Sequence, residues 1–135
     1  MSAGSLSRTK GQTGEREVAA IIRELSGCDV RRRVRQHAGD ADLEGLPGWS
    51  VEVKRHAQTP PGMLALWWAQ TVRQAGDTKA LPVLFYRADR AAWRCVWPAD
   101  LCASPRPHAI RPGYAHTLDA LPEVWWPMAR ALPMW

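Results

Sequence analysis

The chain of 135 residues has few cysteines and no long apolar run. Its three cysteines, Cys28, Cys95 and Cys102, form no CxxC pair and cannot all be bridged, which excludes a disulfide scaffold and predicts a reducing, cytoplasmic location. The longest apolar run, residues 63–69, is far shorter than the roughly 20 residues of a membrane helix. Residues 1–12 are polar and contain no apolar signal core, so we expect no membrane partner.

Lysine is also scarce, because only Lys10, Lys54 and Lys79 are lysines among the 18 basic residues. Arginine does not give up its proton, whereas the pKa of a lysine can be tuned for chemistry. The net charge of +5 and the pI of about 9.6 are compatible with a nucleic-acid partner. The length and the ordinary balance of 46% hydrophobic and 23% charged residues predict a single globular domain over residues 1–135.

Hydrophobic periodicity predicts an α/β order of elements. Residues 1–9 are small and polar, so we expect a flexible arm there, followed by an amphipathic helix with Val18 and Ile22 on its apolar stripe. Glu15 belongs to this stripe and is expected to face the protein body. The expected elements are a helix over 11–26, strands over 28–35, 40–43 and 49–54, a helix over 63–75, strands over 81–87 and 93–97, and helices beginning near 98 and 123.

This order predicts a mixed central sheet flanked by helices. The glycines and proline of residues 44–48 mark a turn, so the strands on either side of it are expected to form a hairpin. Residues 98–135 hold seven of the 11 prolines and are expected to form a Pro/Trp-rich C-terminal extension dominated by loops. Trp125, Trp126 and Trp135 of this extension are interpreted as the cover of an apolar patch or as a subunit interface.

Four charged side chains are predicted to converge at the hairpin. The period of two places Glu52 and Lys54 on one strand face, Asp42 comes from the preceding strand, and Glu15 comes from the first helix. Carboxylates suit a hard cation such as Mg²⁺ or Mn²⁺, and an ammonium beside them can orient a water or neutralise charge on a phosphate. Charged alternation is common on half-exposed strands, so a solvated strand is the alternative interpretation.

The acidic pattern resembles the signature of the PD-(D/E)XK nuclease superfamily. Asp42 is followed, after nine residues, by the triplet Glu52-Val53-Lys54. The proline that the superfamily places before its aspartate is absent, and Asp40 competes with Asp42 for the assignment. We prefer Asp42 because an apolar residue, Leu43, follows it.

The segment 10–17, with the sequence KGQTGERE, is similar to the opening of the archaeal-type Holliday junction resolvases. In that family a KG dipeptide leads into a helix with a catalytic glutamate followed by Arg, which selects Glu15 over Glu17. The resemblance implies a restriction-endonuclease-like core of order α-β-β-β-α-β and a homodimer. It also implies a supporting glutamine on the helix after the Glu-x-Lys strand, and Gln70 stands there.

This interpretation assigns a role to each residue of the site. Mg²⁺ or Mn²⁺ is expected as cofactor, without any small-molecule cofactor. Lys54 would act on the nucleophile or the transition state, and Gln70 would support the site. The expected metal ligands are Glu15, Asp42, Glu52 and the carbonyl of Val53.

Basic residues near the site are candidates for contacts with DNA. Four arginines fall within residues 31–35, and such a run is either a solvated strand edge or a contact with the nucleic-acid backbone. His37 and His56 flank the site and are either exposed loop residues or participants in the chemistry. The predicted DNA contacts are Lys10, Arg31, Arg32, Arg33, Arg35, His37 and Arg55.

The first hypothesis is therefore a Mg²⁺-dependent DNA endonuclease that hydrolyses phosphodiester bonds with a preference for branched DNA. A second hypothesis is a nucleic-acid-binding module that has the same fold and does not cut. A third is a phage-type nuclease for duplex or flap DNA, acting in the bacterial cytoplasm, since sequence-independent phosphate contacts look alike in all of these proteins.

Overall fold

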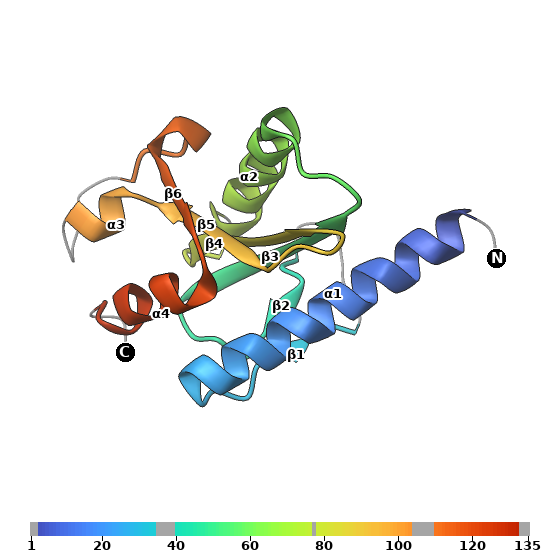
Figure 1. Cartoon of the computed structure of the whole chain (residues 1–135). Helices are drawn as coiled ribbons and strands as arrows, with labels where there is room; N and C mark the ends of the chain where they lie inside the picture. The colour runs from blue at the N-terminus through green and yellow to red at the C-terminus, as the bar shows by residue number, and fades with distance from the viewer. Residues whose placement is uncertain (1–2, 35–39, 77, 104–109, 133–135) are drawn as a thin grey trace.

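The computed structural model describes residues 3–34, 40–76, 78–103 and 110–132 (Figure 1). The element order agrees with the predicted α-β-β-β-α-β core and continues beyond it. The elements are α1 (Ala3–Ser26), β1 (Arg31–Arg32), β2 (Leu43–Glu44), β3 (Trp49–His56), α2 (Pro61–Gly76), β4 (Leu81–Ala88), β5 (Arg94–Pro98), α3 (Asp100–Ala103), η1 (Tyr114–His116), β6 (Thr117–Ala120) and α4 (Pro122–Arg130).

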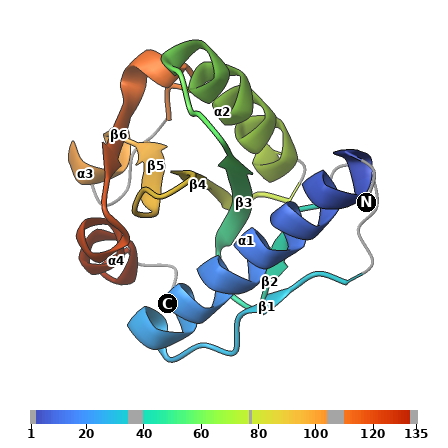
Figure 2. The same ribbon diagram turned by 45° about the vertical axis from the view of Figure 1, so that its right-hand side comes forward.

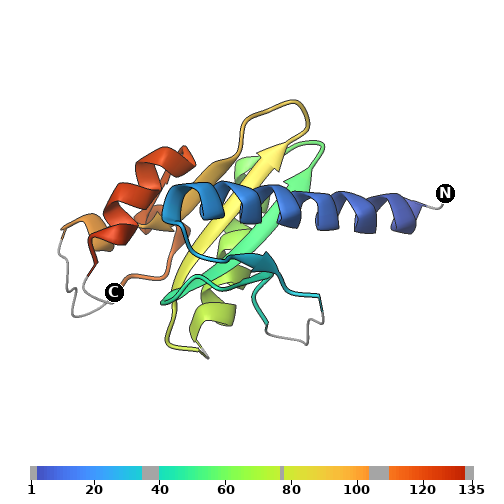
Figure 3. The ribbon, with the colours of Figure 1, turned by 90° about the horizontal axis from the view of Figure 1, so that it is seen from below.

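A mixed sheet of four strands forms the centre, in the order β3-β4-β5-β6. β3 and β4 are parallel, which requires the α2 crossover between them, and the other neighbours are antiparallel. α1 crosses one face of this sheet and α2 lies on the other (Figures 2 and 3). The structure confirms the predicted α/β fold, a mixed central sheet flanked by helices.

The predicted hairpin is present in a looser form. The chain turns at residues 45–48 as expected, but the antiparallel ladder of β2 is made with β1, where Arg32 lies opposite Leu43. Asp42 joins this small pair to β3, because its N–H donates to the carbonyl of Val51 at 3.1 Å. Gly45 has a φ of +98°, and a Cβ there would lie 2.3 Å from the carbonyl oxygen of Asp29. Glycine is therefore required at this turn.

The structure differs from the prediction at residues 3–9, where a flexible arm was expected and α1 is found. α1 begins at Ala3 and ends at Ser26, before Gly27 with a φ of +75°. The segment before Gly11 has no proline, and extending an established helix adds one hydrogen bond for each residue fixed. The predicted stripe is confirmed, since Val18 and Ile22 are fully buried.

The two faces of β3 carry different residues. Val51 and Val53 lie in the core beneath α1, together with Val18 and Ile22. The alternate residues point toward α2, where Trp67 and Trp68 pack with residues of β4 and β5. Glu52 and Lys54 belong to this second face.

The C-terminal extension contributes more to the domain than its proline content predicted. β6 is the fourth strand of the sheet, and Trp125 on α4 is fully buried in edge-to-face contact with Trp49 and Phe85. β6 was not predicted, because its exposed Leu118 and Asp119 break the alternation that marks a strand. The interpretation of Trp125 and Trp126 as cover for an apolar surface agrees with their burial, and Trp135 lies outside the described residues. None of the helices in the described part of the chain is long and apolar enough to cross a membrane.

Candidate active site

Glu52 is the most unusual charged residue of the sheet. It is 3% exposed, and its Oε2 atom is buried without a hydrogen-bond partner. Burial and the charge of Asp42 raise the pKa of Glu52 to about 8, although the ammonium of Lys54 acts in the opposite direction. A buried carboxylate that lacks a partner is unfavourable unless a cation or a proton accompanies it.

Asp42 lies beside Glu52 at the outer edge of β3. Its Oδ2 atom accepts a hydrogen bond of 2.8 Å from the N–H of Val53, and the residue is 8% exposed. The competing candidate, Asp40, is half-buried and lines a neighbouring cavity of about 220 Å³ that extends under Ser50. Of the two aspartates, Asp42 is the one whose charge acts on Glu52.

Lys54 follows Glu52 on the same face of β3. Its Nζ atom lies 3.6 Å from Oε1 of Glu52, and its side chain is largely shielded from solvent. In the parallel register Lys54 lies opposite Tyr86, whose hydroxyl donates a hydrogen bond to Asp119 on β6. The ammonium therefore lies beside a buried carboxylate on the face of the sheet that α2 covers.

Glu15 does not join these two carboxylates. Its Oε2 atom accepts a hydrogen bond of 2.7 Å from Nε of Arg32, and both side chains are mostly buried. In the described ranges no three His, Cys, Asp or Glu side chains form a group that would hold a metal ion. Of the predicted acidic residues, the structure therefore brings Asp42 and Glu52 together, whereas Glu15 of α1 pairs with Arg32 of β1.

The Asp42–Glu52 pair nevertheless fits a hard divalent cation. Carboxylate oxygens are the ligands that Mg²⁺ and Mn²⁺ prefer, and such ions retain several waters when the protein supplies few ligands. The orphaned Oε2 atom of Glu52 offers a free acceptor. The raised pKa of Glu52 reflects its burial first and the charge of Asp42 second, and a cation bound by these residues would offset both.

Two further residues predicted for the site occupy less defined positions. Val53 is buried between Glu52 and Lys54, and its N–H is the donor to Asp42. Gln70 lies half-buried on α2, the helix that covers this face of the sheet.

Most basic residues predicted to contact DNA have acidic partners within the chain. Arg35 and His37 lie outside the described residues. The described ones form ion pairs of 2.7–3.6 Å, in which Lys10 pairs with Asp89, Arg31 with Asp29, Arg32 with Glu15, Arg33 with Glu44 and Arg55 with Glu17.

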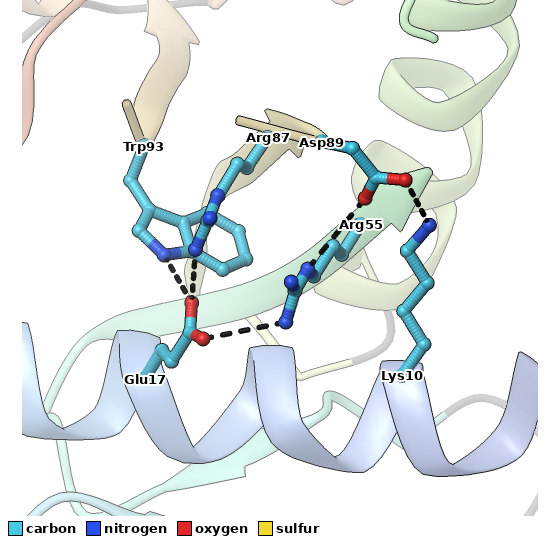
Figure 4. Close-up of polar contacts among 6 residues, drawn as sticks. All are labelled: Lys10, Glu17, Arg55, Arg87, Asp89 and Trp93. Carbon is cyan, nitrogen blue, oxygen red and sulfur yellow. Dashed lines mark hydrogen bonds and ion pairs between the residues drawn. The ribbon is translucent and has the colours of Figure 1, made fainter. Parts of the chain in front are cut away.

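Sequence reasoning missed a charged cluster between α1 and the ends of β3 and β4 (Figure 4). Glu17 accepts hydrogen bonds from Arg87 and from the indole of Trp93, both at 2.8 Å, and from Arg55 at 3.3 Å. Lys10 donates to Asp89 at 2.7 Å. The signal in the sequence was the helical spacing of residues 10, 14 and 17, which puts a lysine, a glycine and a glutamate on one face of α1.

His56 completes the polar face of β3. Its ring stacks on Trp67 of α2, with ring centroids 4.7 Å apart. Burial and the nearby charge of Lys54 lower the pKa of His56, which favours the neutral imidazole.

Two comparisons with known proteins found similarities to this chain. A family model described as "Phage putative PDDEXK endonuclease" matches residues 6–108, a segment that contains Glu15, Asp42, Glu52 and Lys54. Among solved structures, Hjc, a Holliday junction resolvase from the archaeal hyperthermophile Archaeoglobus fulgidus, is similar with a TM-score of 0.49 and 20% identity over 88% of each chain. No curated protein matches the sequence. Because the matched segment covers most of the sequence, the chain belongs to the phage PDDEXK endonuclease family.

Proposed function

We propose that this chain is a metal-dependent endonuclease that hydrolyses phosphodiester bonds in DNA. The observation that carries the proposal is the buried Asp42–Glu52 pair, with one carboxylate oxygen unpartnered and a lysine 3.6 Å away, in a chain that belongs to a nuclease family. A protein that only bound DNA would gain nothing from a buried, mutually repelling pair of carboxylates.

Asp42 and Glu52 would hold Mg²⁺ or Mn²⁺, with Glu15 and the carbonyl of Val53 as further ligands. When bound, such an ion supplies a Lewis acid that polarises a phosphoryl oxygen and lowers the pKa of water. The hydrogen bond from Val53 N–H fixes the Asp42 carboxylate, and the strand fixes Glu52. Both carboxylates are therefore oriented before any ligand arrives, which lowers the entropic cost of binding.

Lys54 would act on the reacting groups themselves. Its ammonium can orient the attacking water or stabilise the negative charge that develops on the phosphoryl oxygens. The contact with Glu52 keeps the Lys54 ammonium on the same face of β3 as the two carboxylates. Gln70 would support the site from α2.

The substrate class we propose is branched DNA, cut by a homodimer. The support is the opening over residues 10–17, with its resemblance to the archaeal-type resolvases. Flap or duplex DNA is the alternative for a phage endonuclease, and substrate tests separate these possibilities.

Cleavage assays test the proposal. A labelled four-way junction, a flap, a linear duplex and a single strand are incubated with Mg²⁺ or with EDTA. We expect metal-dependent cutting, reduced at least about 100-fold by Lys54→Ala and unchanged by Lys79→Ala, a control at an exposed lysine away from the site. Paired symmetrical cuts at the branch point would identify resolution of junctions. Binding without cutting in both Mg²⁺ and Mn²⁺ would refute the enzyme and favour the non-catalytic module.

A further inference from the structure

A cavity of about 430 Å³ lies between α1 and β1, and neither Asp42 nor Glu52 lines it. Residues of α1 from Arg8 to Glu15 form one wall, and Arg32, Arg33 and Val34 form the other. The volume is in the range of ligand-binding sites. Three of its lining residues are arginines, so the cavity would accept an anion.

The charges of this cavity are not fully matched. Arg32 pairs with Glu15 at 2.7 Å, and Arg33 lies 3.6 Å from Glu44. Arg8 is exposed and has no ion pair among the residues that the structure describes. One positive charge is therefore left over, which complements the single negative charge of a phosphodiester.

The chemistry of the lining residues favours a phosphate over a carboxylate or a neutral ligand. A guanidinium presents planar, paired N–H donors that match two phosphate oxygens, and Arg8, Arg32 and Arg33 supply three such groups. The backbone of DNA offers phosphates in a regular row, so one of them can enter this cavity while its neighbours extend beyond it.

We propose that this cavity binds one backbone phosphate of the DNA, and that the phosphate displaces Glu15 from Arg32. This inference rests on the proposed nuclease function. The incoming phosphate takes N–H donors from Arg32 and repels the Glu15 carboxylate by like charge. Glu15 is thereby freed to act with Asp42 and Glu52, where its charge is favourable only when a cation is present.

The backbone connects this exchange to the candidate metal site. Arg32 lies opposite Leu43 in the β1–β2 pair, and the N–H of Arg33 donates to the carbonyl of Asp42 at 2.9 Å. Arg32, the partner of Glu15, therefore lies opposite the residue that directly follows Asp42. Binding of DNA and binding of metal should consequently strengthen each other by the same factor, as linkage requires.

The first experiment measures DNA binding in EDTA as a function of salt. The slope of log K for DNA binding against log salt is negative. Arg8→Gln and Arg32→Gln should each reduce its magnitude by about 1, because each removes one phosphate contact. Arg73→Gln, at an exposed arginine on α2, is the control and should leave the slope unchanged. Unchanged slopes for both cavity variants, with thermal melting confirming that they fold, would overturn the phosphate site.

The second experiment measures Mn²⁺ binding by calorimetry, with and without duplex DNA. All proteins carry Lys54→Ala so that the DNA stays intact. With Arg32 present we expect DNA to tighten Mn²⁺ binding at least about fivefold. Arg32→Gln should tighten Mn²⁺ binding without DNA and reduce this ratio toward one, whereas Arg8→Gln should leave Mn²⁺ binding without DNA unchanged. The double substitution Glu15→Gln, Arg32→Gln should not show the tighter Mn²⁺ binding that is expected of Arg32→Gln without DNA.

The outcomes separate this inference from the proposed function. Mn²⁺ binding that responds to DNA equally with and without Arg32 would overturn the exchange alone. Absence of Mn²⁺ binding in every variant, and also in the unsubstituted protein measured without DNA, would overturn the proposed function and the exchange together. If inorganic phosphate tightened Mn²⁺ binding as much as the duplex does, the assignment to a nucleic-acid backbone would be wrong.

Discussion

The two faces of β3 differ in how their carboxylates are hydrogen-bonded. On the face toward α1, Arg55 shares the Glu17 carboxylate with Arg87 and with the indole of Trp93 (Figure 4). On the face toward α2, Glu52 is more deeply buried and has an oxygen with no partner. Both carboxylates lie within one small domain, but only that of Glu17 is satisfied by donors of the chain.

This difference separates a structural from a functional use of charge. Buried polar groups are almost always hydrogen-bonded, so the Glu17 cluster is what folding alone would select. An unsatisfied carboxylate costs stability and persists where something outside the chain completes it. The α1 face therefore fixes the helix, and the α2 face is left for a ligand.

The largest expected effect is on the activity of Glu52→Gln. We expect cleavage to fall at least about 100-fold. Losing only a hydrogen-bond partner of a metal ligand already costs about 10–100-fold in metal affinity or activity. Above about pH 8, where Glu52 is ionised, the free energy of unfolding should rise, since the substitution removes the burial of a charge beside Asp42. Cleavage rates and urea denaturation measure the two quantities. A strongly destabilised Glu52→Gln protein would contradict the conclusion that the Glu52 carboxylate serves a ligand and not the stability of the fold.

Glu17→Gln should show the opposite pattern. It leaves Arg55 and Arg87 without their carboxylate in a partly buried cluster, so we expect a loss of about 2 kcal/mol in the free energy of unfolding. Glu24→Gln, at an exposed position of the same helix, is the matched control. Equal stability of the two variants in urea denaturation would show that the cluster does not fix α1.

The pH dependence of stability sharpens the comparison for Glu52. The pKa of this residue is raised to about 8 from an ordinary 4.5, so the folded protein binds the proton more tightly than the unfolded chain. Its contribution to stability is full below about pH 4.5 and is lost as the pH rises through about 8. Metal-free protein should therefore lose stability over this window, and Glu52→Gln should lose less. If stability fell equally with pH in the two proteins, the raised pKa of Glu52 would not be the cause of the loss.

The smallest effects are expected at two glycines of α1. Gly11→Ala should stabilise the protein by about 0.8 kcal/mol, since alanine is the better helix former and a Cβ there meets nothing within 4 Å. Gly14→Ala should bring no gain, because its Cβ would lie 3.3 Å from both Arg55 and Trp93. Thermal melting of the pair measures how tightly the Glu17 cluster is packed, and equal gains at both positions would contradict close packing there.

The helices and the central strands were predictable because their pattern is local. The stripe of Val18 and Ile22 defined α1, and the alternation around Val51 placed Glu52 and Lys54 on one face. The four-residue strand β6 escaped prediction, since it is held by pairing with β5 and not by its own composition. The start of α1 escaped for a similar reason, because a packed helix propagates into a polar segment.

The sequence by itself determined the fold class, the strand that carries Glu52 and Lys54, and the proximity of Asp42 through the turn at 45–48. Only the tertiary structure decided which carboxylates are satisfied. Glu17 meets partners 38, 70 and 76 residues away, and Glu15 is held by Arg32 across 17 residues. Helical periodicity gives the direction of a side chain but not the partner it meets. That partner depends on how distant segments pack, and packing left Glu52 buried beside Asp42 with one oxygen unsatisfied.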